Sequence, residues 1–368
     1  MYAVEPEGWS VSRRWMGALA LVGCLMWGAD QAEARGKDAP TAAEATAGTP
    51  ITVPANTWTW VDFPGAKCAN GTSTGIGINI RPDSNQLVIF FEGGGACSDY
   101  QSCYVTGTAS YVTSGYGKST FDGNRPYRNV PLFDQNEPRN PFQNASYVYV
   151  PYCTGDVHSG SAVTTLTGAG QSKATYFVGY NNVSTYLDRL VPTFPKVNRV
   201  LVSGWSAGGF GSAFNWQHVA DAFSQARVDL LDDSGPPFMP NGGKWENWLT
   251  TWGIPLPADC PSCATDPQEF INYYGSIYDG VARFGLLSYT NDSVISSYYN
   301  MTRREFKRSL YDLATESIDP LTSGKYFYVD GSSHVMLSWD RIGPGGVKLS
   351  DWINQMYSDD PNWSSVAP

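Results

Sequence analysis

Histidine is scarce in this chain of 368 residues, which contains only His158, His218 and His334. Any mechanism that uses an imidazole must therefore draw on one of these three side chains. Basic residues are also few, because 24 lysines and arginines face 34 aspartates and glutamates and leave a formal charge of −10. This balance argues against nucleic acid or an anionic membrane surface as a partner. Beyond its first residues the chain has no run of roughly 20 apolar residues, which argues against a transmembrane segment.

The first 34 residues have the features of an export signal. A basic pair, Arg13-Arg14, precedes an apolar run at residues 15–27, and Ala32-Glu33-Ala34 resembles a signal-peptidase cleavage site. We therefore expect a secreted or periplasmic protein, with lipoprotein anchoring at Cys24 as a minor alternative and the export route left open. Without residues 1–34, the 22 basic and 30 acidic residues give a formal charge of −8.

Six cysteines remain once the signal is set aside, an even number that suits an oxidising compartment. Fifteen pairings are possible from sequence alone. Short loops favour the first two of three pairs that we prefer: Cys97 with Cys103, Cys260 with Cys263, and Cys68 with Cys153. Cys260 and Cys263 also have the spacing of zinc ligands, but no second such pair and no nearby histidine completes a site. We expect neither a metal nor a cofactor.

Runs of β-branched and aromatic residues alternate with helix-compatible segments along the rest of the chain. Residues 35–54, rich in alanine, threonine, glycine and proline, are predicted to be a flexible linker, and residues 55–368 a single domain. Helices are predicted at 176–190 and 207–226, and the Pro-, Trp- and Gly-rich segment 236–268 is predicted to be a cap. Eight strands are predicted, at residues 57–63, 75–80, 86–91, 146–150, 199–203, 228–231, 284–289 and 325–329. This pattern indicates an α/β fold with a doubly wound, mainly parallel sheet.

A serine lies between glycines directly after the predicted strand 199–203, in Gly204-Trp205-Ser206-Ala207-Gly208. A strand, a sharp turn and a helix in this order are typical of the nucleophile elbow of an α/β-hydrolase, in which the glycines allow the two backbones to approach closely. An ordinary Gly/Ser turn has the same composition. The catalytic interpretation of Ser206 therefore depends on finding partner residues elsewhere in the chain.

Of the three histidines, His334 is the best candidate for the general base. His218 lies 12 residues beyond Ser206 on the predicted helix, about 18 Å along its axis, which is too far for contact. His158 precedes the serine in a loop after a strand and is a weaker candidate. His334 follows the last predicted strand, so the chain order of serine, acid and histidine is that of α/β-hydrolases.

The acid and the oxyanion donors are sought at the ends of other strands. Asp232 and Asp233 follow one predicted strand and Asp292 follows the next; Asp292 is preferred because its strand directly precedes the histidine strand. Either carboxylate position is also common for a solvated loop or a helix cap. Strand 86–91 ends in glycines, so the backbone N–H groups of Gly94 and Gly95 are expected to join that of Ala207 as the oxyanion hole.

Together these motifs resemble the pectin acetylesterase and Notum family of carboxylesterases from about Trp58 to about Leu337. The motifs are Phe91-Glu92-Gly93-Gly94-Gly95-Ala96-Cys97, Tyr152-Cys153 followed by Gly155-Asp156, Gly204-Trp205-Ser206-Ala207-Gly208-Gly209, Asn291-Asp292-Ser293 and His334. The resemblance implies an α/β-hydrolase-like fold, metal-independent ester hydrolysis by Ser206, Asp292 and His334, an oxyanion hole at Gly94, Gly95 and Ala207, and a Cys97–Cys103 disulfide. Plant members carry a tryptophan where this chain has Ala96, so the pocket shape is not carried over.

Three functions are therefore in competition. The preferred one is an exported serine carboxylesterase that removes short acyl groups, above all acetyl, from carbohydrate esters or other small esters. A lipase or polyester hydrolase is the second, and a catalytically silent glycan-binding protein is the third. An intact set of serine, acid and histidine argues against the third, because a binding protein needs none of them. The natural ester, the acyl length, the oligomeric state and any motion of the cap stay open.

Overall fold

The computed structural model describes residues 48–129, 133–338 and 340–368. The predicted export signal, with Cys24, and residues 35–47 of the predicted linker lie outside this part of the chain. The linker prediction is wrong for its last residues, because Ile51 is buried in the core and its N–H donates to the Thr193 hydroxyl at 2.8 Å. Among the described residues, no helix combines the length and the apolar character needed to cross a bilayer.

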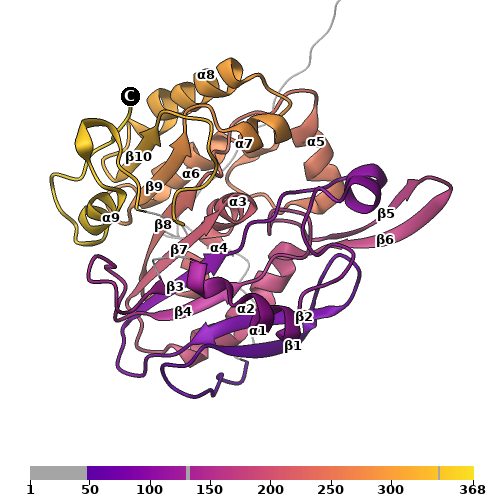
Figure 1. Ribbon diagram of the computed structural model, residues 1–368, viewed down its shortest axis with the longest axis horizontal. Helices are drawn as coiled ribbons and strands as arrows, with labels where there is room; N and C mark the ends of the chain where they lie inside the picture. Colours follow the sequence, from indigo (N-terminus) through magenta and orange to yellow (C-terminus); the bar gives the residue numbers. More distant parts are fainter. Residues whose placement is uncertain (1–47, 130–132, 339) are drawn as a thin grey trace, which may run out of the picture. The chain divides into compact units, whose positions relative to one another are not determined.

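An eight-stranded sheet forms the centre of the domain (Figure 1). Its order is β1-β2-β4-β3-β7-β8-β9-β10; β1 and β4 pair with β2 antiparallel, and every other pairing is parallel. All eight predicted strands are present, with ends that differ by up to four residues. Their bounds are Thr59–Lys67 (β1), Ser73–Asn79 (β2), Gln86–Phe91 (β3), Ser146–Val150 (β4), Arg199–Trp205 (β7), Arg227–Asp233 (β8), Phe284–Tyr289 (β9) and Gly324–Val329 (β10). This mainly parallel sheet with flanking helices is an α/β-hydrolase-like fold.

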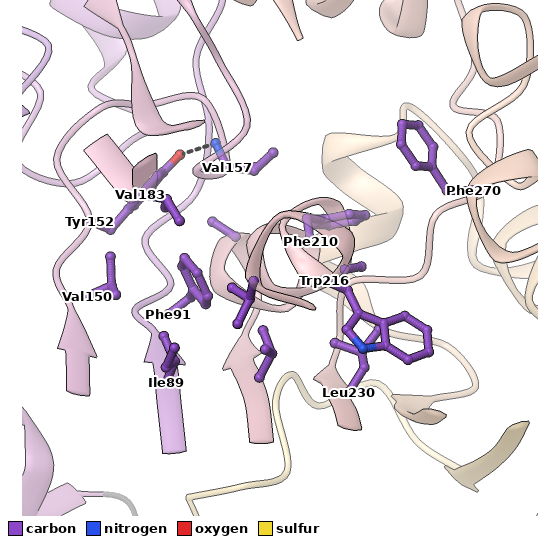
Figure 2. Packing of buried hydrophobic residues seen from close by; sticks show 14 of the residues in the cluster. Ile89, Phe91, Val150, Tyr152, Val157, Val183, Phe210, Trp216, Leu230 and Phe270 are labelled. Atoms are coloured by element: carbon purple, nitrogen blue, oxygen red, sulfur yellow. Dashed lines mark hydrogen bonds between the residues drawn. The ribbon is translucent and has the colours of Figure 1, made fainter. Parts of the chain in front are cut away.

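The central strands are buried on both faces, which is why they are continuous apolar runs in the sequence. In β3, Leu87, Ile89 and Phe91 belong to one core cluster, whereas Val88 and Phe90 belong to the other. Figure 2 shows the first cluster, with Ile89 and Phe91 of β3 beneath the helix that carries Phe210. The central strands, β3 among them, are therefore enclosed by a packed core on each face of the sheet.

Helices cover both faces of this sheet. Residues of α2, α3, α4, α6 and α8 pack into the first cluster and residues of α1 and α9 into the second. The bounds are Lys118–Asn124 (α1), Gly179–Thr193 (α2), Ala207–Phe214 (α3), Trp216–Ala222 (α4), Lys244–Trp248 (α5), Glu269–Tyr278 (α6), Ser293–Tyr298 (α7), Arg303–Leu313 (α8) and Leu349–Tyr357 (α9). The segment 207–226, predicted as one helix, forms two helices, α3 and α4, with Asn215 between them. The side-chain amide of Asn215 donates to the carbonyls of His158 and Gly211.

A two-stranded ribbon was not predicted. It consists of β5 (Ala162–Gly168) and β6 (Gln171–Phe177), which pair antiparallel and extend away from the sheet (Figure 1). The first two residues of the helix predicted at 176–190 belong to β6 instead, and α2 begins at Gly179. The ribbon contacts the predicted cap, since the Thr164 hydroxyl donates to the carbonyl of Thr251 at 2.6 Å.

The segment 236–268 contains α5, a short π-helix at Leu249–Gly253, a short 3₁₀ helix at Pro261–Ala264, and otherwise irregular chain. Two of its tryptophans hold it in place: Trp245 donates from its indole N–H to the carbonyl of Cys263, and Trp252 donates to the carbonyl of Cys97. The three preferred disulfides are all present, linking Cys97 to Cys103, Cys260 to Cys263 and Cys68 to Cys153.

Candidate active site

Ser206 occupies a sharp turn between β7 and α3. Its backbone angles, φ 58° and ψ −123°, lie in a region that non-glycine residues rarely adopt. Its N–H donates to the carbonyl of Asp233 at 2.7 Å, so the turn is tied to the neighbouring strand β8. Strain that is held by the surrounding structure is common at functional sites, and here it presents the serine at the carboxyl end of the sheet.

The glycines around Ser206 are needed because three backbone segments meet there. A Cβ atom on Gly204 would lie 2.2 Å from the carbonyl oxygen of Gly208, and one on Gly208 would lie 2.0 Å from that of Phe91. Both distances are far below van der Waals contact, so a side chain at either position would force β3, β7 and α3 apart. This observation favours the elbow over an ordinary Gly/Ser turn.

The structure brings His334 and Asp292 together from the ends of β10 and β9. Nδ1 of His334 lies 2.7 Å from Oδ2 of Asp292, and the Asp292 side chain is fully buried. The other carboxylate oxygen of Asp292 accepts the N–H groups of Val294 and Ile295 as the N-cap of α7. Nε2 of His334 is enclosed and has no hydrogen-bond partner among the described residues. Because Nδ1 is engaged by the carboxylate, Nε2 is the nitrogen left for a proton transfer.

The glycine loop after β3 lies against the nucleophile. A Cβ atom on Gly93 would come within 3.0 Å of Cβ of Ser206, and one on Gly95 within 2.1 Å of the carbonyl oxygen of Thr108. Gly95 also has a φ of 79°, which favours glycine. Ala207 is the first residue of α3, where backbone N–H groups lack helical partners. The loop and the helix start therefore both border Ser206.

An apolar pocket opens beside Ser206, with about 560 Å³ of empty space. Besides Ser206, Gly95 and Ala207, it is lined by Ala96, Val157, Phe210, Phe214, Pro237, Pro240, Trp245, Trp248, Trp252, Pro267, Ile295, Tyr298 and Tyr299. Eleven of these 16 residues belong to α3, α7 and the segment 236–268 predicted to be a cap. Trp248 and Trp252 stack with ring centroids 5.1 Å apart, and Trp252 is almost fully buried. These tryptophans form a wall of the pocket.

The other two histidines have different surroundings. His158 is buried, its Nε2 bonds the carbonyl of Glu92 at 2.8 Å, and burial lowers its pKa to about 4. His218 stacks on Tyr180 and contacts the Ser184 hydroxyl. His218 therefore has the packing role that its distance along the helix predicted.

The competing aspartates at the end of β8 are both buried, and neither contacts a histidine through a hydrogen bond. Asp232 accepts the N–H of Gly235, and burial raises its pKa well above the usual range. Burial also raises the pKa of Asp233, to about 6. Among the described residues, no group of three or more histidine, cysteine or acidic side chains could hold a metal ion.

Sequence reasoning missed two features of the site. The first is a set of three pocket residues in α7 and directly after it: Ile295, Tyr298 and Tyr299. They follow Asp292 with the spacing of one helical face, a pattern that is present in the sequence. Glu92, directly before the glycine loop, accepts the N–H of Tyr152, and burial raises its pKa to about 7. Nothing in the sequence distinguishes this carboxylate from a solvated one.

The amino-acid sequence matches a known protein family and several individual proteins. The family model for pectinacetylesterase matches residues 52–242. The chain is 29% identical over 170 residues to palmitoleoyl-protein carboxylesterase notum2 of Xenopus laevis, covering 46% of this chain and 33% of the relative. It is 27% identical over 231 residues to palmitoleoyl-protein carboxylesterase NOTUM of Drosophila melanogaster, covering 56% of this chain and 33% of the relative. It is 26% identical over 175 residues to the protein of that name from Homo sapiens, covering 46% of this chain and 34% of the relative. The matches span about a third of the length of these relatives.

Proposed function

Because this chain belongs to the pectinacetylesterase family, a family of carboxylic ester hydrolases, we propose that it hydrolyses acyl esters through Ser206, His334 and Asp292. The observation that carries this proposal is the 2.7 Å contact between His334 and Asp292, which leaves Nε2 of His334 enclosed and without a partner. Most buried side-chain polar atoms in native proteins are hydrogen-bonded, so an enclosed ring nitrogen without a partner favours a role in proton transfer.

The reaction follows from these roles. The hydroxyl of Ser206 attacks the ester carbonyl while Nε2 of His334 takes its proton, and the protonated imidazole then gives that proton to the departing alcohol. Water, activated by the same nitrogen, releases the acyl group from Ser206. Asp292 holds the imidazole in the required tautomer and stabilises its charged form.

The tetrahedral intermediate needs donors for its negative oxygen. The N–H groups of Gly94, Gly95 and Ala207 are proposed for this role, because the glycine loop and the start of α3 both border Ser206. Removing one such donor from an acyl-transfer enzyme costs about 10²–10³ in kcat, so this loop contributes a large share of catalysis.

The apolar pocket is relevant to the length of the acyl group that the site accepts. A short acyl ester of a carbohydrate, with acetyl as the acyl group, is the substrate expected from the sequence. The apolar pocket beside Ser206 favours a second candidate, an ester with a longer acyl chain, because its aromatic walls gain from every methylene that they bury, about 0.8 kcal/mol each. The matched relatives are named for a palmitoleoyl ester, which is a long acyl chain.

Export is proposed on two grounds. The first 34 residues resemble a secretory signal, and the three disulfides suit an oxidising compartment. Mass spectrometry of the protein from culture supernatant, periplasm and membrane fractions tests this, and cleavage after Ala34 is the expected result.

One experiment separates the candidate functions. Purified protein is assayed on p-nitrophenyl acetate, butyrate and octanoate, with Ser206→Ala as the control. Hydrolysis with acetate preferred supports the short-acyl candidate, and preference for octanoate supports the longer chain. The Ser206→Ala variant should fold, lose at least about a thousandfold in kcat, and resist a fluorophosphonate that labels the wild type. No hydrolysis by the wild-type protein, or equal labelling of the variant, refutes the proposal and favours a binding protein.

A further inference from the structure

Asp233, the last residue of β8, touches the nucleophile's backbone. Strands β7 and β8 pair in parallel, with Trp205 opposite Asp233. Ser206 directly follows Trp205, the last residue of β7. The N–H of Ser206 donates to the carbonyl of Asp233 at 2.7 Å. The position of Ser206 is therefore set partly by the end of a strand that supplies neither the acid nor the base.

The side chain of the same residue holds the loop that carries His334. Oδ2 of Asp233 accepts the N–H groups of Met336 at 2.7 Å and Leu337 at 2.8 Å. These bonds join residues more than 100 positions apart in the sequence. The first of the two donors, Met336, lies two residues after His334. The carboxylate therefore fixes the backbone that follows the histidine, where Met336 and Leu337 are buried in the core.

Ser234, the residue after Asp233, also bonds the loop that follows His334. The Ser234 hydroxyl donates to Oδ1 of Asp233 at 2.9 Å and accepts the N–H of Val335 at 3.3 Å. Val335 has a φ of 56°, a left-handed conformation that is costly for a β-branched residue. Three successive N–H groups after His334 thus bond to two side chains at the end of β8, and these bonds hold a strained turn.

The carboxylate of Asp233 is fully buried, and no lysine or arginine pairs with it among the described residues. Burial raises its pKa to about 6, while the N–H groups of Leu337 and Met336, the Ser234 hydroxyl and the charge of His334 act in the opposite direction. A buried carboxylate costs free energy unless it is well hydrogen-bonded. The cost is kept low here by the same bonds that hold the histidine loop.

We propose that Asp233 is a positioning residue for catalysis, which sets the separation between the nucleophile and the base by bonding the backbone of Ser206 and the loop after His334. This inference rests on the proposed function. It gives β8 a role distinct from that of the acid: Asp292 orients the imidazole ring through Nδ1, whereas Asp233 locates the loop from which that ring projects.

The test compares three variants with wild type: Asp233→Ala, Asp233→Asn and, as the matched control, Asp232→Asn. Asp232 is the adjacent buried acid, but its carboxylate accepts the N–H of Gly235 and does not reach the histidine loop. For each protein, the extent of fluorophosphonate labelling counts the functional sites, and kcat is expressed per labelled site at a temperature equally far below each melting temperature. A purely structural role would reduce the number of labelled sites and leave kcat per site unchanged.

In Asp233→Ala we expect kcat per site to fall about 100-fold with KM within about threefold, because a displacement of about 1 Å has this effect on catalysis. Asp233→Asn should retain more activity, with a loss of about three- to tenfold, because its amide oxygen still accepts both N–H groups but without the negative charge. Asp232→Asn should stay within about twofold, since its amide oxygen can still accept the N–H of Gly235 and neither side chain reaches the histidine loop.

Wild-type kcat per site in Asp233→Asn and in any folded Asp233→Ala overturns the inference. An equal loss in Asp232→Asn also overturns it, because the effect would then belong to the end of β8 as a whole. If Asp233→Ala does not fold, Asp233→Asn decides alone. The proposed function fails separately: in that case the wild-type protein neither hydrolyses p-nitrophenyl esters nor reacts with the fluorophosphonate.

Discussion

His334 and His158 both lie near the carboxyl edge of the sheet, yet their ring nitrogens are engaged in opposite ways. His334 bonds a carboxylate through Nδ1, and its Nε2 has no partner among the described residues. His158 bonds the carbonyl of Glu92 through Nε2, and its ring packs against Phe91 and Tyr152. A nitrogen already bonded to a backbone carbonyl cannot exchange a proton with a substrate without breaking that bond.

The difference separates the proposed catalytic role of His334 from the structural role of His158. His158 fixes the carbonyl directly before the glycine loop, and Gly211 of α3 lacks a side chain where the ring of His158 lies, since a Cβ there would come within 2.8 Å of it. The ring is therefore part of the packing between β3 and α3. The ring of His334, in contrast, is bonded through Nδ1 to Asp292, and its enclosed Nε2 has no partner among the described residues.

Removal of the imidazole of His334 should have the largest effect. We expect His334→Ala to lose about 10⁵–10⁶ in kcat, since loss of the base in a serine hydrolase costs about as much as loss of the whole triad. The melting temperature should also fall, because the loss of the imidazole leaves Oδ2 of the fully buried Asp292 without its partner. Steady-state kinetics and circular dichroism measure both. A loss below about tenfold would move the base to another residue, with His158 the first to be tested.

Asp292→Asn should have the next largest effect, on the order of 10⁴ in kcat, because an amide favours the wrong tautomer of His334. Asparagine is as good an N-cap as aspartate, so the cap of α7 should survive and the stability should be nearly unchanged. This choice of variant separates the catalytic role of the carboxylate from its capping role. Kinetics at matched thermal stability give the answer, and full activity would assign Asp292 to the cap alone.

The sheet was predictable from the sequence because its strands are buried on both faces and read as unbroken apolar runs. The β5–β6 ribbon was not, because its strands are rich in threonine and serine and several of its residues are exposed. The break between α3 and α4 at Asn215 was not predictable for a different reason: it involves a bond from the Asn215 amide to the carbonyl of His158, 57 residues earlier in the chain.

The candidate site was predictable where its residues carry local motifs, as at Ser206 and the glycine loop. His334 and Asp292 followed from the small number of histidines and from chain order. The contacts of Asp233 could not be predicted, because its partners are backbone N–H groups at 336 and 337, which no side-chain pattern identifies. The alternative interpretation of Asp232 and Asp233 as solvated loop carboxylates is thus wrong for both, since both lie in β8 and are buried.

The comparison of the histidines also predicts a pH dependence of stability. Burial lowers the pKa of His158 to about 4 from its ordinary 6.5, so between these values the unfolded chain binds a proton that the folded chain does not. The stability that the neutral ring contributes is present above about pH 6.5 and is lost as the pH falls to about 4, up to about 3 kcal/mol.

His158→Gln should therefore lose less stability than wild type between pH 7 and pH 4.5, and chemical denaturation at several pH values measures the difference. The comparison with wild type is required because Glu92 and Asp233, with pKa values raised by burial to about 7 and about 6, act in the opposite direction in both proteins. Parallel curves for the two proteins would contradict the neutral, buried state of His158.

His218→Asn should have the smallest effect of all. The ring stacks on Tyr180 at 4.2 Å and contacts the Ser184 hydroxyl at 3.2 Å, so its loss should cost about 1 kcal/mol from the aromatic contact and the hydrogen bond together. The kcat should equal that of wild type, because helix α4 holds the ring away from the elbow. Burial also lowers the pKa of His218 to about 4, but its ring is half-buried and water reaches it, so the acid-dependent part of its contribution should be smaller than that of His158. A fall in kcat per labelled site in this variant would show that packing of α4 against α2 reaches the nucleophile, and the three histidines could then no longer be ranked by what their ring nitrogens bond.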